Sequence, residues 1–186
     1  IPREEIVIST QLGFLGGGST VKADTALPHI ERFKQEIGVD VLDLVVLHGV
    51  RDSHWPEQVK RIRDELSILK EKGTVRAVGC SCQSRDALRI AVDDPWVDVI
   101  FVCINDRQKN GDATTRDVIH ALYKARANGK FVVGMSIFGG GLFIHTDERD
   151  SSLCYVFGKG LVDAVSIGFT HPEEIDDTMG RVNQIV

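Results

Sequence analysis

The feature that most constrains the fold is an unbroken apolar run at residues 44–47, Leu-Val-Val-Leu, which His48 and Gly49 follow directly. Four residues are too few for a typical helix, and a continuous apolar run with β-branched residues indicates a strand buried on both faces. Such strands form parallel sheets, and in α/β barrels the chemistry lies at the carboxyl ends of the strands. His48 is therefore a candidate functional residue, and Gly49 is expected to break the strand directly after it. The structural alternative is a histidine satisfied by hydrogen bonds at a strand end.

An apolar run followed by an amphipathic segment recurs about six times along the chain. Strands are expected at residues 5–10, 44–47, 74–80, 97–104, 131–136 and 162–167. Helices are expected at residues 26–37, 56–72, 84–92, 116–127, 152–157 and from 172 onward, with Ser84 capping the third. This order predicts a single α/β domain over residues 1–186, with a barrel-type or doubly wound parallel sheet.

Polar side chains follow the expected strands. They are Gln11, His48, Ser81, Asn105, Ser136 and Thr170. Because the carboxyl ends of adjacent parallel strands meet at one edge, we expect Gln11, His48, Ser81, Asn105 and Met135 to open onto the same rim. The glycine-rich loop at residues 13–18 lacks the Gly-Lys-Ser/Thr ending of a P-loop and is interpreted as a connection.

Six strands are fewer than a closed barrel needs, since that fold has eight strands and usually about 250 residues. The chain has 186 residues and begins at Ile1 rather than at methionine. We therefore expect either an open sheet or two further strands upstream of Ile1. The domain is expected to be a barrel-type domain that is incomplete at its N-terminus.

Composition narrows the classes of partner. The net charge is −5 and no basic tract is present, which argues against nucleic acid and anionic membrane as partners. No apolar run approaches the roughly 20 residues of a membrane span. The four cysteines show no CxxC pattern, and three of them lie in or beside expected buried strands, which suits a reducing compartment, so a cytoplasmic location is expected. Of these cysteines, Cys82 is the one expected to face a site.

Four ordered motifs resemble the aldo-keto reductase family. Residues 2–10 are similar to the segment entering its third barrel strand, and residues 39–48 to its fourth. Residues 69–81 match the family stretch "lk..GkvRaiGvS", and residues 97–105, 132–142 and 162–175 fit strands six to eight. The resemblance implies a TIM barrel whose first two strands are absent from this chain.

The resemblance also implies a reaction, hydride transfer between a nicotinamide cofactor and a small carbonyl or alcohol substrate. His48 matches the family histidine that orients the carbonyl, whereas the family aspartate and tyrosine would lie upstream of Ile1. The catalytic lysine position is Gln11, whose neutral amide can donate a hydrogen bond but cannot favour a tyrosinate electrostatically.

The implied cofactor contacts match the family in part. Ser81 matches the serine that holds the nicotinamide carboxamide, but Cys82 replaces the asparagine and Phe101 the glutamine that the family has next. Met135 stands where a tyrosine stacks under the nicotinamide, and it can still pack against a ring. The resemblance extends the cofactor site to a set of residues after the strands, namely Asn105, Ser136, Phe138, Gly140, Gly168 and Thr170.

Glycines after the last two strands suggest phosphate binding independently of any family. Gly139, Gly140, Gly141 and Gly168 stand where barrel enzymes commonly bind phosphate through backbone N–H groups. Turn glycines are the alternative, and at Gly168 the two interpretations are equally weighted.

The resemblance also bears on the choice between NADPH and NADH. Family members that prefer NADPH hold its 2′-phosphate with basic side chains after strand eight. Here the lysine position is Gly168 and the arginine position is Glu174, while His171 offers only partial compensation. We therefore expect NAD(P) binding in which NADPH is not favoured over NADH.

Two function classes compete. The first is a divergent NAD(P)-dependent oxidoreductase, which His48, Ser81 and the glycine loops favour. The second is a catalytically degenerate barrel with a binding or structural role, which Gln11, Phe101 and Cys82 favour. A metal-dependent hydrolase is a weaker alternative because no His-x-His motif occurs, so no metal site is predicted. The oligomeric state is left open.

Overall fold

The computed structural model describes residues 2–13, 25–108 and 115–185. Its strands form one sheet in chain order, β1-β2-β3-β4-β5-β6, and every neighbouring pair is parallel. The strands are β1 (Ser9–Gly13), β2 (Leu42–Val50), β3 (Val75–Cys82), β4 (Val99–Cys103), β5 (Phe131–Met135) and β6 (Ala164–Val165). The expected parallel order is confirmed.

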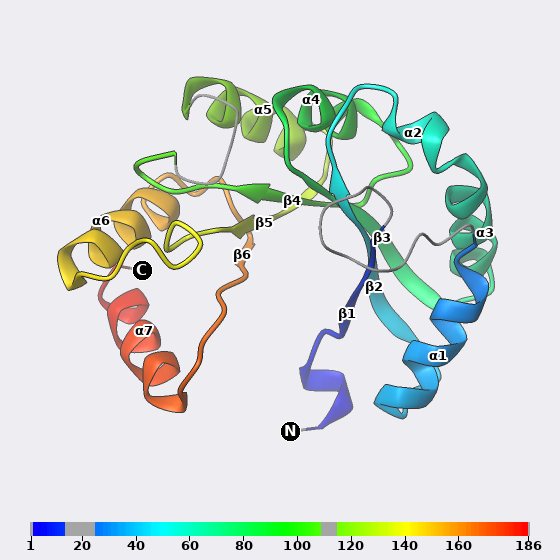
Figure 1. The fold of residues 1–186 in the computed structure, drawn as a ribbon, viewed down its shortest axis with the longest axis horizontal. Coiled ribbons are helices and arrows are strands. Elements are labelled where there is room, and N and C mark those ends of the chain that lie inside the picture. Colours follow the sequence, from blue (N-terminus) through cyan, green and yellow to red (C-terminus); the bar gives the residue numbers. More distant parts are fainter. Residues whose placement is uncertain (1, 14–24, 109–114, 186) are drawn as a thin grey trace.

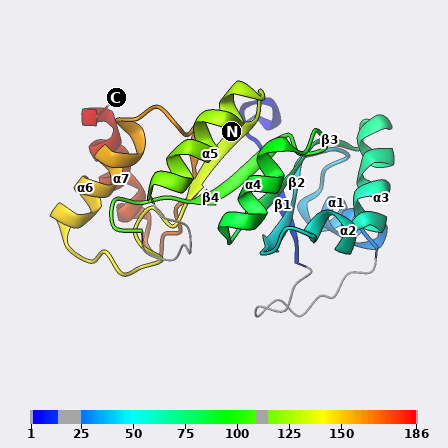
Figure 2. The ribbon, with the colours of Figure 1, turned by 90° about the horizontal axis from the view of Figure 1, so that it is seen from above.

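Helices cover the outside of the curved sheet, in an arc from α1 through α4 and α5 to α6 and α7 (Figure 1). They are α1 (Leu27–Ile37), α2 (Trp55–Gln58), α3 (Lys60–Glu71), α4 (Arg85–Asp93), α5 (Thr115–Ala127), α6 (Thr146–Phe157) and α7 (Pro172–Ile185), while the short 3-10 helix η1 (Arg3–Glu5) precedes β1 near the N-terminus. Seen from above, α4 and α5 lie side by side (Figure 2). None of the described helices combines the length and apolar character that a membrane-spanning segment requires.

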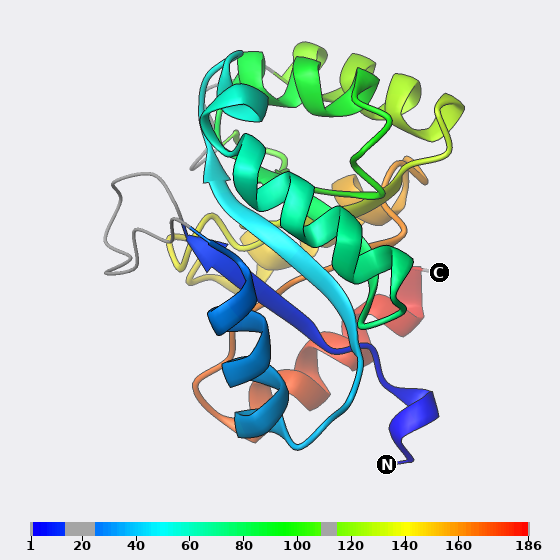
Figure 3. The same cartoon turned by 90° about the vertical axis from the view of Figure 1, so that its right-hand side faces the viewer.

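The start predicted for the first strand, at residue 5, is wrong. Arg3–Glu5 form the short 3-10 helix η1, and β1 begins only at Ser9. The apolar side chains between them do not pack as a strand would require, since Ile6 and Val7 are 39% and 77% exposed. From Ser9 the chain pairs with β2, and the two strands run side by side (Figure 3). Gln11, expected just beyond the strand, therefore lies within it.

Other element bounds also differ from the sequence expectation. The helix expected at residues 56–72 is split at Val59 into α2 and α3. The helix expected at 152–157 begins six residues earlier, at Thr146, and the strand expected at 162–167 pairs only at Ala164–Val165. Ser84 caps α4 as expected, because its hydroxyl accepts a hydrogen bond of 3.0 Å from the Ala87 N–H. The glycine-rich stretch at 14–18 lies outside the described residues.

Gly49 does not end β2, contrary to the sequence expectation. The strand continues through His48 and Gly49 to Val50. Gly49 has φ +79°, and the pairing register of β2 on β3 shifts between Leu47 and Val50. A glycine with left-handed φ inside a strand produces such a local irregularity without breaking the strand. His48 is therefore held by strand pairing, with an irregularity directly after it.

Two apolar cores lie on opposite faces of the sheet. The larger is between the sheet and the helices and includes Val45, Leu47, Cys80 and Ile100 among many others. The smaller lies on the inner face and comprises Leu44, Val46, Val99, Phe101 and Val133. Alternate residues of one strand point to opposite faces, so the position of His48, two residues after Val46, assigns it to the inner face.

A buried carboxylate fastens the segment before β1 to the strand ends. Asp43, 7% exposed, accepts hydrogen bonds from Ile8 N–H (2.9 Å), Arg3 Nη2 (2.6 Å) and Arg76 Nη1 (2.7 Å). Burial alone would raise the pKa of Asp43, but the Ile8 hydrogen bond and the two guanidinium groups outweigh it and lower that pKa. The carboxylate is thus held in its charged form.

Both tryptophans of the chain flank a single arginine in the helical layer. The Arg63 guanidinium carbon lies 5.4 Å from the centroid of the Trp55 ring and 4.8 Å from that of Trp96. Its Nη2 also pairs with Asp94 at 2.7 Å. Trp96 Nε1 donates to the Ser67 hydroxyl at 3.0 Å, so this cluster joins α3 to the segment before β4.

Candidate functional site

A hydrogen-bonded pair from two adjacent strands forms the centre of the candidate site. Ser81 Oγ, on β3, lies 3.0 Å from Nδ1 of His48, on β2. The Gly49 N–H donates to the same hydroxyl oxygen at 2.8 Å. His48 and Ser81 therefore lie at the same end of the sheet, as the sequence predicts.

The surroundings of Ser81 define which nitrogen of His48 carries the proton. Ser81 is fully buried, and a buried hydroxyl needs an acceptor for its own hydrogen. His48 Nδ1 is the acceptor within hydrogen-bond distance among the described residues. With the hydroxyl donating to Nδ1, the neutral imidazole carries its hydrogen on Nε2. Nε2 is then the donor that a ligand on the inner face can use.

Gln11 shares the inner face with this pair. It is paired in register with Val46 of β2, a member of the inner core, and Gly13 is paired with His48. Register partners in a parallel sheet point to the same side. Gln11 is exposed, so its amide is accessible from the inner face. Met135 also lies there, because it packs against the inner core.

Asn105 is buried and stabilises the turn that follows β5. It is 1% exposed, and its Nδ2 donates to the Ser136 carbonyl at 3.1 Å. Ser136 follows β5 with φ +57°, a left-handed conformation that is unfavourable for a residue with a side chain. The Gly139 N–H also donates to the Ser136 carbonyl, at 2.9 Å. These two bonds hold the turn that leads from β5 into the glycine loop.

A cavity of about 450 Å³ lies between the loops that follow β5 and β6. Five residues expected to bind the cofactor line it: Ser136, Phe138, Gly140, Gly168 and Thr170. The structure therefore brings these residues together from two segments about 30 positions apart. A volume of this size falls within the range of small-molecule sites.

Gly168 has a conformation and surroundings that do not require glycine. Its φ is not left-handed, and a Cβ at this position would meet no atom within 4 Å. Gly139 differs, because it has φ +61° and its Cβ would come within 2.9 Å of the Phe143 ring. At Gly168 a side chain would project into space beside the cavity, so its absence keeps the backbone accessible to a ligand.

Cys82 does not join the other expected cofactor residues. It is 3% exposed within the core between the sheet and the helices. Its Sγ lies 3.7 Å from that of Cys80, and this hydrogen bond, together with burial, raises the pKa of the Cys82 thiol. Phe101 is likewise a member of the inner core rather than a polar contact. The sequence expectation that Cys82 faces a site is not supported by this position.

Comparison with known proteins identifies the family. The sequence model of the aldo/keto reductase family matches residues 1–179. This chain belongs to the aldo/keto reductase family. A comparison with curated protein sequences gives no significant match.

Solved aldo-keto reductases have a similar fold. A Pseudomonas aeruginosa protein assigned to the aldo-keto reductases superposes with a TM-score of 0.79 at 21% identity, covering 98% of this chain and 66% of that one. The holo form of the Bacillus halodurans aldo-keto reductase AKR11C1 gives 0.72 at 15%, covering 97% and 67%. A thermostable aldo-keto reductase in complex with the inhibitor epalrestat gives 0.71 at 17%, covering 98% and 68%.

At these identities the likeness establishes the fold alone. The chain spans about two thirds of the length of the solved aldo-keto reductases, and its six strands form part of their TIM barrel. The expected fold class is therefore confirmed. His48, Ser81 and the glycine cavity all lie at the carboxyl ends of the strands, where barrel enzymes of many kinds bind ligands.

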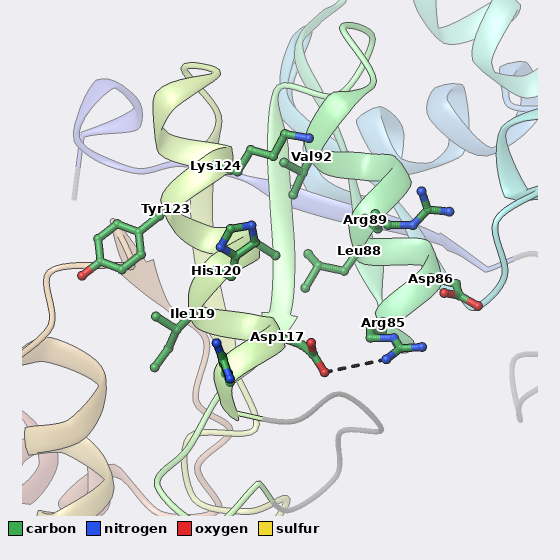
Figure 4. Close-up of a pocket in the computed structure, with 12 residues that line it drawn as sticks. Arg85, Asp86, Leu88, Arg89, Val92, Asp117, Ile119, His120, Tyr123 and Lys124 are labelled. Atoms are coloured by element: carbon green, nitrogen blue, oxygen red, sulfur yellow. Dashed lines mark ion pairs between the residues drawn. The ribbon is translucent and has the colours of Figure 1, made fainter.

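A second, larger cavity of about 1070 Å³ lies on the outer surface between α4 and α5, lined by other residues than the cavity beside the β5 and β6 loops (Figure 4). Arg85 and Asp117 form an ion pair across it at 3.9 Å, and Lys124 pairs with Asp93 at 2.6 Å. His120 and Tyr123 lie along its α5 wall. It is an open groove between two helices whose other faces pack on the sheet.

Arg149 is a functional candidate that the sequence did not indicate. It lies on α6 and lines the cavity with the glycines. Its sequence context, residues 146–152, reads as an ordinary polar helix surface, so only the packing of α6 beside the loops shows its orientation. Within the residues that the structure describes, no three histidine, cysteine, aspartate or glutamate side chains are grouped as metal ligands.

Proposed function

We propose that this aldo/keto reductase family member is an NAD(P)-dependent oxidoreductase that acts on small carbonyl or alcohol substrates. The observation that carries the proposal is the bond between Ser81 Oγ and His48 Nδ1 at the carboxyl ends of adjacent strands. A surface histidine needs no such partner. A histidine that orients a substrate does need one, because its tautomer and ring position must be fixed.

His48 would act as a hydrogen-bond donor. With Nδ1 accepting from Ser81, Nε2–H can donate to a carbonyl oxygen on the inner face. That hydrogen bond strengthens as negative charge develops on the oxygen, which favours the transition state over the bound substrate. The nicotinamide cofactor, when bound, supplies a hydride to a carbonyl carbon or accepts one from an alcohol carbon.

Gln11 would add a second donor without adding charge. Its amide shares the inner face with His48 and can donate to a substrate oxygen or to a neighbouring hydroxyl. A neutral amide does not lower the pKa of a neighbouring acid as a lysine would. Position 11 thus supplies no cation. We therefore propose that the transition state is stabilised mainly by the hydrogen bond from His48.

The residues around the cavity fit the phosphate-bearing part of a dinucleotide. Gly140 and Gly168 expose backbone to it, and Thr170 and Ser136 supply polar groups at its margin. The 2′-phosphate of NADPH has a poorer fit, since Glu174 is the residue at the expected arginine position and it lines the same cavity. We propose that NADPH is not favoured over NADH.

The proposal also includes the domain organisation and the cellular location of the protein. We treat residues 1–186 as one barrel-type domain and propose a cytoplasmic location. The four cysteines are all free, including the adjacent buried thiols of Cys80 and Cys82, which suits a reducing compartment.

The test is the activity of the full-length protein and of His48→Ala. A panel of small aldehydes, ketones and alcohols is assayed with NADH, NADPH and their oxidised forms. His48→Ala should lower kcat/KM roughly tenfold to a few hundredfold while NADH affinity changes little, because a hydrogen bond to the reacting group is lost. His120→Ala is the matched control, since His120 is exposed in the outer groove.

Two results would contradict the proposal. A His48→Ala variant with wild-type kcat/KM would remove His48 from the reaction. A wild-type protein that binds neither cofactor and turns over none of the panel would instead support the non-catalytic barrel.

A further inference from the structure

The outer groove, the cavity between α4 and α5, carries basic residues at intervals of one helical turn on both of its walls. Arg85 and Arg89 lie four positions apart on α4. Arg116, His120 and Lys124 repeat that interval on α5 (Figure 4). Residues four positions apart lie on the same face of a helix, with a rise of about 6 Å between them. Each wall therefore presents a regular row of basic side chains.

Two of these arginines have no partner among the described residues. Arg89 and Arg116 are exposed, and they make no hydrogen bond or ion pair with any residue that the structure describes. Arg85 pairs with Asp117 at 3.9 Å, which is long for an ion pair. Exposed ion pairs of this kind contribute little to stability, so an outside carboxylate can replace Asp117.

The acidic residues at the groove do not cancel its positive charge. Asp86 and Asp117 lie in the first turns of α4 and α5, where a carboxylate also compensates the positive end of the helix dipole. Asp93 is held by Lys124 at 2.6 Å, and this bond is the main cause that lowers the pKa of Asp93. Four residues that line the groove are formal cations and two are carboxylates, whereas the whole chain has a net charge of −5. The groove thus has the opposite sign to the protein.

The dimensions of the groove match an extended protein segment. Alternate side chains of an extended chain lie about 6.6 Å apart, close to the rise of about 6 Å between arginines one helical turn apart. Helix α4 has 9 residues and is about 14 Å long, enough for about four residues of such a segment. Tyr123, on the α5 wall, is 61% exposed and offers an aromatic contact. Tyrosine and arginine are enriched among the residues that dominate binding energy at protein interfaces.

The place of the groove in the fold keeps it apart from the inner face. Helices α4 and α5 follow the central strands β3 and β4, so the groove lies in the middle of the helical arc (Figure 1). None of the residues that line it belongs to the cavity beside the glycine loops. A ligand in the outer groove and a ligand on the inner face can therefore bind at the same time.

We propose that the outer groove binds an acidic, extended segment of a partner protein, whose carboxylates at alternate positions contact Arg85, Arg89 and Arg116. A protein segment fits better than nucleic acid or an anionic membrane, because Asp86 and Asp117 would repel a continuous row of phosphates. A peptide backbone can instead donate N–H groups to these two carboxylates. The inference does not depend on the oxidoreductase proposal.

The experiment measures the fluorescence anisotropy of a labelled peptide, Gly-Glu-Ala-Glu-Ala-Glu-Gly, titrated with the full-length protein. The wild type should bind with a Kd of the order of 10–100 μM, and binding should weaken as salt screens the exposed charges. Arg89→Glu and Arg116→Glu should each raise the Kd by about fivefold or more, because a like charge then faces the peptide. Arg89→Lys keeps the charge and should stay closer to the wild type than Arg89→Glu.

Lys72→Glu is the matched control. Lys72 follows α3, is exposed, lies outside the groove and makes no ion pair with the described part of the chain. It reverses the same charge, so its Kd should stay within about twofold of the wild type where long-range electrostatics are screened. A peptide with glutamine in place of each glutamate should bind at least about tenfold more weakly. Thermal unfolding shows whether each variant keeps the fold, and NADH titration should be unchanged in all of them.

Four results would overturn the inference. The first is a wild-type protein that does not bind the acidic peptide, and the second is unchanged affinity in the variant that combines Arg89→Glu with Arg116→Glu. The third is an equal loss in Lys72→Glu, since net charge rather than the groove would then explain binding. The fourth is tighter binding of an oligothymidylate or of phosphatidylserine vesicles than of the peptide, abolished by the same two substitutions. In each case the NADH titration and the activity assays would still test the oxidoreductase proposal separately.

Discussion

Replacing Ser81 by alanine tests the hydrogen bond on which the candidate site depends. The substitution removes a fully buried hydroxyl that bonds to the Gly49 N–H at 2.8 Å and to His48 Nδ1 at 3.0 Å. Gly49 is itself buried, so its N–H would be left without an acceptor. A buried unpaired donor costs about 1–3 kcal/mol, and the lost volume is only one oxygen atom. At roughly 2–4 °C per kcal/mol for a chain of this size, Tm should fall by about 2–12 °C.

The same substitution should reduce activity through His48. Without the Ser81 hydroxyl, nothing among the described residues selects the tautomer with hydrogen on Nε2, and the ring loses a contact that fixes its position. We expect kcat/KM to fall by about three- to tenfold, the equivalent of one neutral hydrogen bond. Calorimetry gives the stability, steady-state kinetics the activity, and NMR shifts of the ring nitrogens the tautomer.

Ser84→Ala supplies a control with a similar cost and no contact with the site. Ser84 caps α4 by accepting from the Ala87 N–H at 3.0 Å, and losing such a cap costs about 1 kcal/mol. Its kcat/KM should match the wild type at temperatures where both are folded. If Ser81→Ala kept full activity and a single Nε2–H tautomer, or if Ser84→Ala lost as much activity, the reasoning from the Ser81 hydroxyl would be refuted.

Two further substitutions test the fold and the cavity. Asp43→Asn should lower the free energy of unfolding by roughly 1–3 kcal/mol at pH 7, after discounting the exposed arginine partner. Because the folded-state pKa of Asp43 is lowered, its contribution is fully present above the unfolded pKa of about 3.9 and is lost as the pH falls through the folded pKa. Urea unfolding should therefore show a difference that narrows below about pH 4, and a constant difference would contradict this account. Gly139→Ala, with φ +61° and a 2.9 Å approach to Phe143, should destabilise by at least about 1 kcal/mol. Gly168→Ala should change stability by less than about 0.5 kcal/mol yet weaken NADH binding, and thermal unfolding with NADH titration separates the two effects.

The order of the sheet could be predicted from the sequence because each strand carries its own signal. The run at 44–47 and the strands β4 and β5 are apolar without interruption, which requires cover on both faces. Only parallel neighbours joined by helices satisfy that requirement along one chain. The helix cap at Ser84 could also be predicted, because capping depends only on residues within four positions of the cap.

The missed features all depend on contacts between distant segments. Ile6 and Val7 are apolar, but β1 starts beyond them, and the Ile8 N–H is taken by Asp43 rather than by a strand. Gly49 looked like a strand end because its accommodation within β2 depends on Ser81, 32 residues further on. The orientation of Arg149 depends on how α6 packs beside two loops. No local pattern contains that information.

The position of the two tryptophans determines how these variants can be read spectroscopically. Trp55 and Trp96 both lie against Arg63 in the outer helical layer, on the opposite side of the sheet from the inner face that carries His48. In the cofactor-free protein, intrinsic emission therefore reports on the junction between α3 and the segment before β4. A variant whose emission matches the wild type while its nicotinamide titration changes has lost a ligand contact. A variant whose emission shifts has an altered structure around the tryptophans. Tryptophan emission is thus a control for folding in every variant of the inner face.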